Sequence, residues 1–167
     1  MQPARRKKQL VTKSITVPGN IERACEDFNA GRFYEAHEWL EEVWQMERGP
    51  ARDCYKGLIQ VAAAFVHLSR GKYAGAERLL RTALGYLRPY RAEGALGFDI
   101  EAIAAAAEDM YARLVAAGPE GAGRLDLSRR PRFAFDAAVL ARQAAGDGLW
   151  GFDAAGRAIA MEITVAQ

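Results

Sequence analysis

His37 and Glu41 place two polar side chains on a helix face that is otherwise apolar. They lie in the segment 33–44, which has the spacing of an amphipathic helix, and residues four apart lie on the same side of a helix. A buried imidazole or carboxylate must be satisfied by a hydrogen-bond partner, by water or by a ligand. The pair could therefore share a proton or bind a cation.

The other acidic residues of this segment belong to a different face. Helical periodicity places Glu35, Glu38 and Glu42 away from the apolar stripe, so we expect them to be solvated. Glu41 instead lies beside His37 and next to Trp44, at the border of the stripe. Glu41 is thus the acidic residue of this helix that needs a partner.

A second helix, expected over about 51–70, would bring further polar residues to this pair. If the two helices pack antiparallel, Gln60 and His67 each lie about one turn from the residue opposite His37. Two imidazoles, a carboxylate and an amide suit a divalent zinc, nickel or iron ion with open positions for water. The candidate metal ligands are His37, Glu41 and His67. The expected pocket-lining residues are Phe33, Leu40, Trp44 and Gln60.

Three interpretations of these residues remain open. They bind a metal ion, they form a satisfied polar network in the core, or they line a pocket for a small molecule or a protein partner. The chain lacks the repeated Glu-x-x-His of di-iron helical bundles and the His-Glu-x-x-His of helical zinc sites. It also lacks a phosphate-binding loop, a dinucleotide fingerprint and a serine nucleophile motif. No catalytic residue is assigned, no organic cofactor is expected, and whether the protein is an enzyme stays open.

Composition predicts a single globular domain, because the 167 residues are 50% hydrophobic and 26% charged. Residues 1–13 are basic and contain no acid or stacking aromatic, so we expect a solvated tail and no nucleic-acid binding. No apolar run is long enough to span a membrane, and no apolar segment follows the basic start. Cys25 and Cys54 belong to no Cys-x-x-Cys or Cys-His motif, so we expect both to be small core residues. Two unpaired cysteines also suit a reducing compartment. We expect a cytoplasmic protein, and homo-oligomerisation stays open.

The pattern of glycines, prolines and apolar residues predicts a mainly α fold of five or six helices around a central antiparallel helical hairpin. We divide the chain into a basic tail at 1–17 with strand-like alternation at its end, a helical core at 18–118 and a C-terminal extension at 119–167. The expected helices cover about 21–29 with Asn20 as N-cap, 32–47, 51–70, 72–87, 100–117 with Asp99 as N-cap, and 136–145. Gly118 is expected to open a glycine-rich loop.

Strand periodicity occurs near both ends of the chain. Apolar residues alternate with polar ones over 11–17 and again over 159–165. Two arrangements are compatible with this pattern: a small terminal sheet that joins both chain ends, and a hairpin between 149–152 and the last segment.

A weak repeat also runs through the helical core. The glycine-aromatic-alanine-leucine pattern that begins at Gly31 recurs at Gly71. The second copy has Glu77 and Arg81 in the places of His37 and Glu41, so the polar pair is specific to the first copy. Two similar helical units, rather than a peptide-binding solenoid, account for the pattern.

A family resemblance rests on two segments of the chain, Phe28-Asn29-x-Gly31-x-Phe33-x-Glu35-Ala36-His37-Glu38-x-Leu40-Glu41-x-x-Trp44 and Gly57-Leu58-Ile59-Gln60-x-Ala62-Ala63-Ala64-Phe65-x-His67. They resemble the prokaryotic domain of unknown function 309 family over about residues 25–88. Its hallmark, His-x-x-x-Glu-x-x-Trp/Tyr, is matched by His37, Glu41 and Trp44. The resemblance implies a multihelical fold and a metal-binding role suggested for the motif, and it brings no established activity.

We therefore expect a small helical protein that binds a ligand or a divalent metal ion through His37 and Glu41. The enzyme alternative is a metal-dependent hydrolase in which His37 is a ligand and Glu41 a ligand or general base. The third alternative is a non-catalytic scaffold in which the motif is a structural polar network. In that case the Trp39 side of the helix and the arginine-rich face of 72–87 would hold a protein partner.

Overall fold

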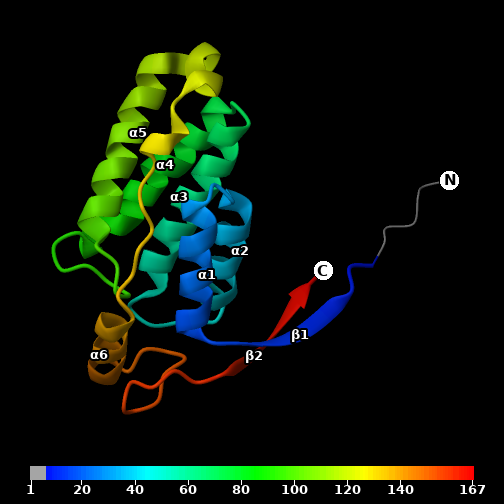
Figure 1. Cartoon of the computed structure of the whole chain (residues 1–167), viewed down its shortest axis with the longest axis vertical. Helices are drawn as coiled ribbons and strands as arrows, with labels where there is room; N and C mark the ends of the chain where they lie inside the picture. The colour runs from blue at the N-terminus through cyan, green and yellow to red at the C-terminus, as the bar shows by residue number, and fades with distance from the viewer. Residues whose placement is uncertain (1–6) are drawn as a thin grey trace.

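The computed structural model describes residues 7–167, so the part of the expected basic tail at residues 1–6 lies outside the described residues. The mainly α, multihelical single domain is confirmed, and a two-stranded sheet accompanies the helices (Figure 1). No helix in residues 7–167 has the length and apolar character needed to cross a membrane. The elements are β1 (Leu10–Ile15), α1 (Val17–Asn29), α2 (Phe33–Trp44), α3 (Arg52–Ser69), α4 (Tyr73–Leu87), α5 (Ile100–Gly121), α6 (Ala137–Asp147) and β2 (Met161–Ala166), with short 3-10 turns η1 (Arg88–Tyr90), η2 (Ala122–Arg124) and η3 (Leu127–Arg129).

Each of the first four helices packs against the next one along the chain, so α3 lies between α2 and α4 (Figure 1). This position explains why α3 is apolar around most of its circumference: ten of its residues are buried. A glycine lets α4 approach α3 closely, because a Cβ at Gly57 would lie 2.6 Å from Leu87 Cδ2.

Local signals start and stop most helices where the sequence indicates. Gly31 (φ +83°) and Gly71 (φ +66°) turn the chain into α2 and α4, the two copies of the repeat. Asp99 and Asp136 cap α5 and α6 by accepting hydrogen bonds from backbone N–H groups of their first turns. Gly148 ends α6 in the left-handed conformation.

Two helix boundaries differ from expectation. The first helix begins four residues before position 21, because Thr16 is its N-cap and Pro18 is tolerated in its first turn. Asn20 is not a cap. At the other end of the core, the chain leaves the helical conformation at Gly118 (φ 68°, ψ −179°) and then resumes a helical turn, so the expected glycine-rich loop is mostly helical.

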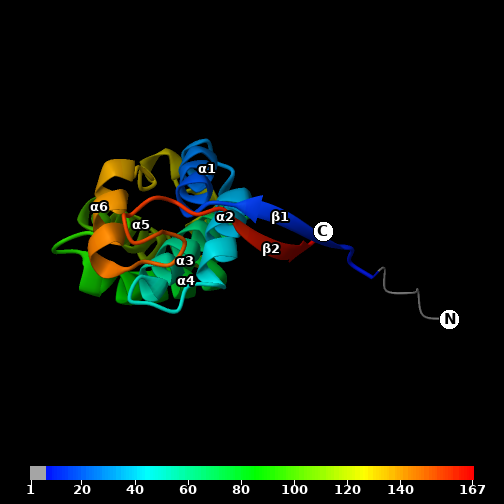
Figure 2. The same cartoon turned by 90° about the horizontal axis from the view of Figure 1, so that it is seen from below.

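The alternating segments at the two chain ends form one antiparallel ribbon, in which Leu10 pairs with Ala166 and Ile15 with Met161. The terminal sheet is therefore the arrangement adopted. The alternative hairpin is reduced to a single bridge between Phe152 and Ala158. Figures 1 and 2 show the ribbon projecting from the helical body beside α2.

Aromatic packing fastens the C-terminal extension to the helices. The rings of Phe28 and Phe133 stack with centroids 3.9 Å apart, and Phe33 and Phe65 pack edge-on or tilted against the same cluster. The Asn29 side chain donates to the backbone oxygen of Phe133 and accepts from its N–H. The extension is thus held both by apolar contact and by hydrogen bonds between the Asn29 side chain and the Phe133 backbone.

Candidate functional site

His37 and Glu41 face each other on α2, with Nε2 of the imidazole 3.2 Å from Oε2 of the carboxylate. One helical turn separates them, which is why an i, i+4 pair can meet. Their side chains are 24% and 37% exposed, so the pair lies at the border between core and solvent. The ring of Tyr34 stacks over the imidazole at a centroid distance of 5.9 Å.

The other nitrogen of this imidazole has no partner. Nδ1 of His37 is buried and forms no hydrogen bond within the described part of the chain. A carboxylate beside Nε2 favours a proton on that nitrogen, which leaves Nδ1 as an acceptor in the neutral ring. Oε1 of Gln60, on the adjacent helix α3, is likewise buried without a partner. Buried polar atoms are normally paired, so each of these two atoms can still accept a hydrogen bond from a water molecule or a ligand.

A cleft of about 590 Å³ opens between α2 and the terminal ribbon. Its helical wall consists of Tyr34, Glu38, Glu41, Glu42 and Gln45. Its other wall is formed by β1 and β2 and includes Lys13 and Thr164. The acidic partner of His37 therefore also lines an open polar cleft.

The charges in this cleft are not equivalent. Glu42, expected to be solvated, is only 12% exposed because it pairs with Lys13 of β1 and accepts a hydrogen bond of 2.9 Å from Asn20 Nδ2. Glu38 and Glu41 form no ion pair with a lysine or arginine among residues 7–167. The Glu38 carboxylate raises the pKa of the neighbouring Tyr34 hydroxyl, and Glu41 adds to this effect. Lys8 also lines the cleft, so three glutamates of α2 face two lysines, and the side chains of the lining carry one excess negative charge.

His67 lies apart from this pair. It packs against α4, so closely that a Cβ at Gly75 would be 2.4 Å from its Nδ1. No group of three or more histidine, cysteine, aspartate or glutamate side chains in residues 7–167 is arranged to hold a metal ion. The structure thus brings His37 and Glu41 together and does not join His67 to them.

The residues expected to line a pocket also have other surroundings. Phe33 and Leu40 are buried in the core, and Gln60 is partly buried on α3. Trp44 packs under two cations, with Arg52 Cζ 4.2 Å and Lys56 Nζ 4.4 Å from its ring centroid. None of the four lines the cleft beside α2.

Trp39 is occupied by intramolecular contacts rather than presented as an anchor for a partner. Its Nε1 donates to Asp27 at 2.8 Å, and Lys13 and Arg23 lie over its ring at 4.8 and 4.9 Å. This side of α2 is therefore already covered by α1 and β1.

Sequence reasoning missed the cleft because one of its walls is the ribbon. The spacing of Tyr34, Glu38, Glu41 and Gln45 is a helical face, and this signal was present in the sequence. That face becomes a wall only when the two chain ends pair beside it. Strand alternation at both chain ends predicts the sheet as one of two arrangements, but this periodicity does not say that the ribbon lies beside α2.

The helices and this polar pair define a small multihelical domain with a His-x-x-x-Glu motif on its second helix. Residues 21–79 match the model of the family described as Domain of unknown function (DUF309), which confirms the resemblance. The matched segment covers most of α1, all of α2 and α3, and the first half of α4. It therefore contains the His37–Glu41 pair.

Two curated relatives match over similar lengths. The chain is 40% identical over 76 residues to "Uncharacterized protein YpuF" of Bacillus subtilis (strain 168), covering 44% of each chain. It is 38% identical over 65 residues to an "Uncharacterized protein" of Aquifex aeolicus (strain VF5), covering 38% of this chain and 20% of that one. The match thus spans less than half the length of each relative. No solved structure matches this chain significantly.

Proposed function

We propose that this protein binds a small polar ligand in the cleft between α2 and the terminal ribbon, with Glu41 as the main recognition group. The observation that carries the proposal is the place of Glu41, whose side chain both lines the cleft and contacts His37 Nε2 at 3.2 Å. A ligand that neutralises Glu41 changes the charge beside the imidazole.

The charges favour a ligand that carries a positive group. Lys13 compensates Glu42, whereas Glu38 and Glu41 form no ion pair with a lysine or arginine in the described residues, although Lys8 also lines the cleft. A guanidinium or ammonium group can pair with such carboxylates both as a cation and as a hydrogen-bond donor. Gln45 and Thr164 supply neutral polar contacts on the two walls.

A resident metal ion fits these residues poorly. Structural zinc sites use four protein ligands and catalytic ones three, while among the candidate ligands in residues 7–167 only His37 and Glu41 come together. A divalent ion would need its remaining donors from a bound molecule. Metal binding is therefore retained as an outcome to be measured, and the hydrolase alternative gains no support from the geometry.

His37 Nδ1 is an acceptor open to a ligand or a water molecule. It is buried and has no hydrogen-bond partner among residues 7–167, while Nε2 contacts a carboxylate that is about one-third exposed.

The test is a titration of ¹⁵N-labelled protein with L-arginine amide, and separately with Zn²⁺ and Ni²⁺, followed by amide shifts in α2 and β2. We expect saturable shifts with arginine amide that require about tenfold more ligand in Glu41→Gln. The matched control is Glu77→Gln, which alters the equivalent i, i+4 pair of the second repeat, on α4. Equal affinity in wild type and Glu41→Gln would contradict the proposal. Stoichiometric Zn²⁺ or Ni²⁺ binding that His37→Gln abolishes would replace it with a metal site.

A further inference from the structure

The terminal ribbon has two free edges, because its sheet contains only β1 and β2. The backbone N–H of Gln167 donates to the backbone oxygen of Gln9 at 2.9 Å, so these residues form a hydrogen-bonded pair. Hydrogen-bonded and non-hydrogen-bonded pairs alternate along an antiparallel ladder. The register therefore turns the backbone groups of Glu162, Thr164 and Ala166 away from β1, toward the outer edge of β2. No hydrogen bond to these outward groups occurs within residues 7–167.

The two edges differ in charge. Lysine on an edge strand opposes pairing with a further strand, and β1 contains Lys13 and follows Lys7 and Lys8. β2 contains no lysine or arginine, and its one charged residue is Glu162. Two strands alone are marginally stable, and a third strand adds backbone hydrogen bonds and side-chain contacts. The edge of β2 is therefore the one that favours a further strand, and its charge favours a basic one.

The edge of β2 borders the cleft beside α2. The residues that β1 contributes to the lining are Val11 and Lys13, which point to the same face of the ribbon. In contrast, four consecutive residues at the other chain end, 164–167, line the cleft. Consecutive strand residues point to opposite faces, so a cleft that contacts all four reaches β2 from its side and not through one face alone.

The helical wall of the cleft is acidic on the side of α2 away from β1. Lys13 pairs with Glu42 and lies over the Trp39 ring, so β1 covers that part of the helix. Helical spacing places Glu38 and then Glu41 farther around α2 from Glu42, and both line the cleft. Neither forms an ion pair with a lysine or arginine in the described part of the chain. A strand added to β2 would direct alternate side chains toward these carboxylates.

We propose that the cleft binds an extended basic segment of a partner protein, which adds to the edge of β2 as a third strand. The inference rests on the proposed function, because it identifies the positive group recognised by Glu41 as an arginine or lysine side chain of that segment. Backbone hydrogen bonds to Thr164 and its edge neighbours supply affinity, and the carboxylates select a cationic side chain. With Lys8 and Lys13 in the lining, one negative charge is in excess, which one such side chain balances.

The test compares the capped hexapeptide acetyl-Thr-Val-Thr-Arg-Thr-Val amide with N-acetyl-arginine amide, which carries the same charge. Binding is followed by amide shifts of ¹⁵N-labelled protein. We expect the peptide to bind about tenfold more tightly, because it adds backbone hydrogen bonds. The amide hydrogens of Glu162, Thr164 and Ala166 should exchange more slowly in the peptide complex only. Equal affinity for the two ligands would overturn the strand addition and leave the proposed function intact, whereas no binding of either would contradict both.

The direction of the peptide backbone gives a second criterion. Alternate residues of a strand direct their backbone groups to opposite edges, so only every second peptide N–H can bond to β2. Two further peptides carry N-methyl groups at the odd-numbered or at the even-numbered residues. One of them should bind about tenfold more weakly than the parent peptide, and the other should bind equally well. Equal affinities of the two methylated peptides would overturn the proposal.

Matched proline variants test the edge from the protein side. Thr12 and Thr164 lie opposite each other in the ribbon, and the backbone N–H of each points to its own free edge. Proline is tolerated where the N–H points away from the ladder. Thr164→Pro should weaken peptide binding about tenfold. Thr12→Pro, which loses the same 3.2 Å hydroxyl contact, should not weaken it. Both variants should bind N-acetyl-arginine amide like wild type, and an equal loss of peptide binding in both would overturn the proposal.

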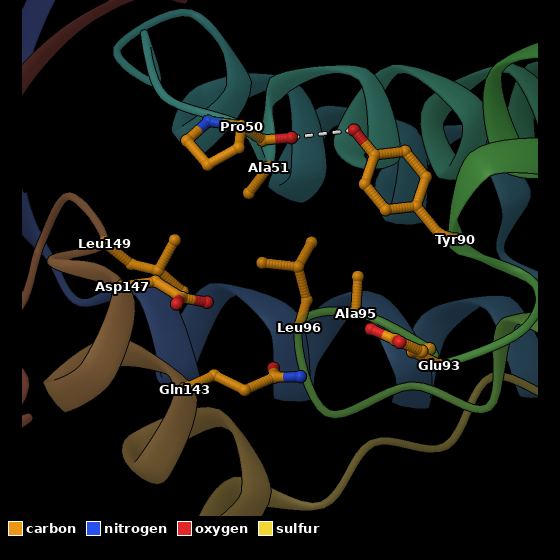
Figure 3. A pocket seen from close by; sticks show the side chains of 10 residues that line it. Pro50, Ala51, Tyr90, Glu93, Ala95, Leu96, Gln143, Asp147 and Leu149 are labelled. Atoms are coloured by element: carbon orange, nitrogen blue, oxygen red, sulfur yellow. Dashed lines mark hydrogen bonds between the residues drawn. The ribbon is translucent and has the colours of Figure 1, made fainter.

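A control acid lies in a second hollow, of about 270 Å³, between the start of α3 and the end of α6 (Figure 3). Glu93 lines this hollow, and no residue of β1 or β2 does. Glu93→Gln should leave peptide affinity unchanged, whereas Glu41→Gln should weaken it about tenfold. Equal effects would indicate attraction by overall charge and overturn the proposal. So would a peptide-free dimer, measured by sedimentation, that Thr164→Pro dissociates, because a second copy of this chain would then occupy the edge.

Discussion

His67 and Gly75 lock α3 against α4: the imidazole occupies the space that a side chain at position 75 would need. A Cβ there would lie 2.4 Å from Nδ1 and 2.9 Å from Cγ of the ring. The imidazole that the sequence pattern associated with the α2 pair is thus used for packing between two other helices. A glycine on the facing helix makes this packing possible.

Gly75→Ala should destabilise the protein by about 1–3 kcal/mol, because the new methyl group must displace the His67 ring from a packed position. Gly85→Ala, in the same helix, meets nothing within 4 Å. It should stabilise by about 0.5–1 kcal/mol through helix propensity alone. Urea unfolding of the two variants measures both effects. Equal shifts in the same direction would contradict the close His67 contact.

Asn20→Ala should destabilise the protein by about 1–3 kcal/mol, because it leaves buried partners on α2 unpaired. The Asn20 side chain is 2% exposed and donates to the backbone oxygen of Trp39 at 3.0 Å and to Glu42 at 2.9 Å. Ser69→Ala serves as a control, since its hydroxyl is exposed and bonds within its own helix. Thermal or urea unfolding checks the difference. A loss no larger than that of Ser69→Ala would show that the Asn20 contacts contribute little.

Cys25 should resist alkylation in the native protein at pH 8. Burial raises the pKa of its thiol from 9.0 to about 12, so almost no thiolate is present. Because the folded pKa is the higher one, the unfolded chain releases this proton first, and stability is lost as pH rises above 9. Cys25→Ala should reduce that loss by at most about 1.4 kcal/mol per pH unit. Mass spectrometry after iodoacetamide treatment, with and without urea, tests the reactivity; rapid native labelling would show that the site is open.

Glu77 should contribute stability that depends on pH in the opposite direction. Hydrogen bonds from Arg81 and Tyr111 hold the pKa of its carboxyl below 4.5. A lowered folded pKa gives stability above 4.5 that disappears as pH falls through the folded value. The difference in urea midpoint between wild type and Glu77→Gln should therefore be small but steady at neutral pH, shrink below 4.5 and weaken with salt. A difference that persists in strong acid would require another cause.

Helix positions could be predicted because their signals are local. Gly31, Gly71, Asp99 and Asp136 each act on the next few residues, and the helices they start were placed to within a few positions. The prediction of Asn20 as N-cap is wrong because Thr16 lies earlier in the chain and its side chain already accepts a hydrogen bond from the first turn. Where two caps compete, the tertiary contacts of the side chains decide between them.

The candidate site could be predicted only in part. The His37–Glu41 contact follows from helical spacing alone, and the structure contains it. The direction of the His67 side chain depends on which helix covers each side of α3. The informative residue is Gly75, which lies 38 positions after His37. Glu42 forms an ion pair with Lys13, which belongs to strand β1. The helical pattern around Glu42 contains no information about that strand.

The antiparallel register of the ribbon also determines how the molecule responds to force. Leu10 pairs with Ala166 at one end of the ribbon, and Ile15 pairs with Met161 at the other, next to α1. Tension applied at Leu10 and Ala166 therefore breaks the hydrogen-bonded residue pairs of the ribbon one after another, as in unzipping. It does not shear all the pairs at once. The ribbon would peel open before the helices are strained. Since the ribbon is one wall of the cleft beside α2, a pull on residues 10 and 166 would open that cleft while leaving the helical body folded.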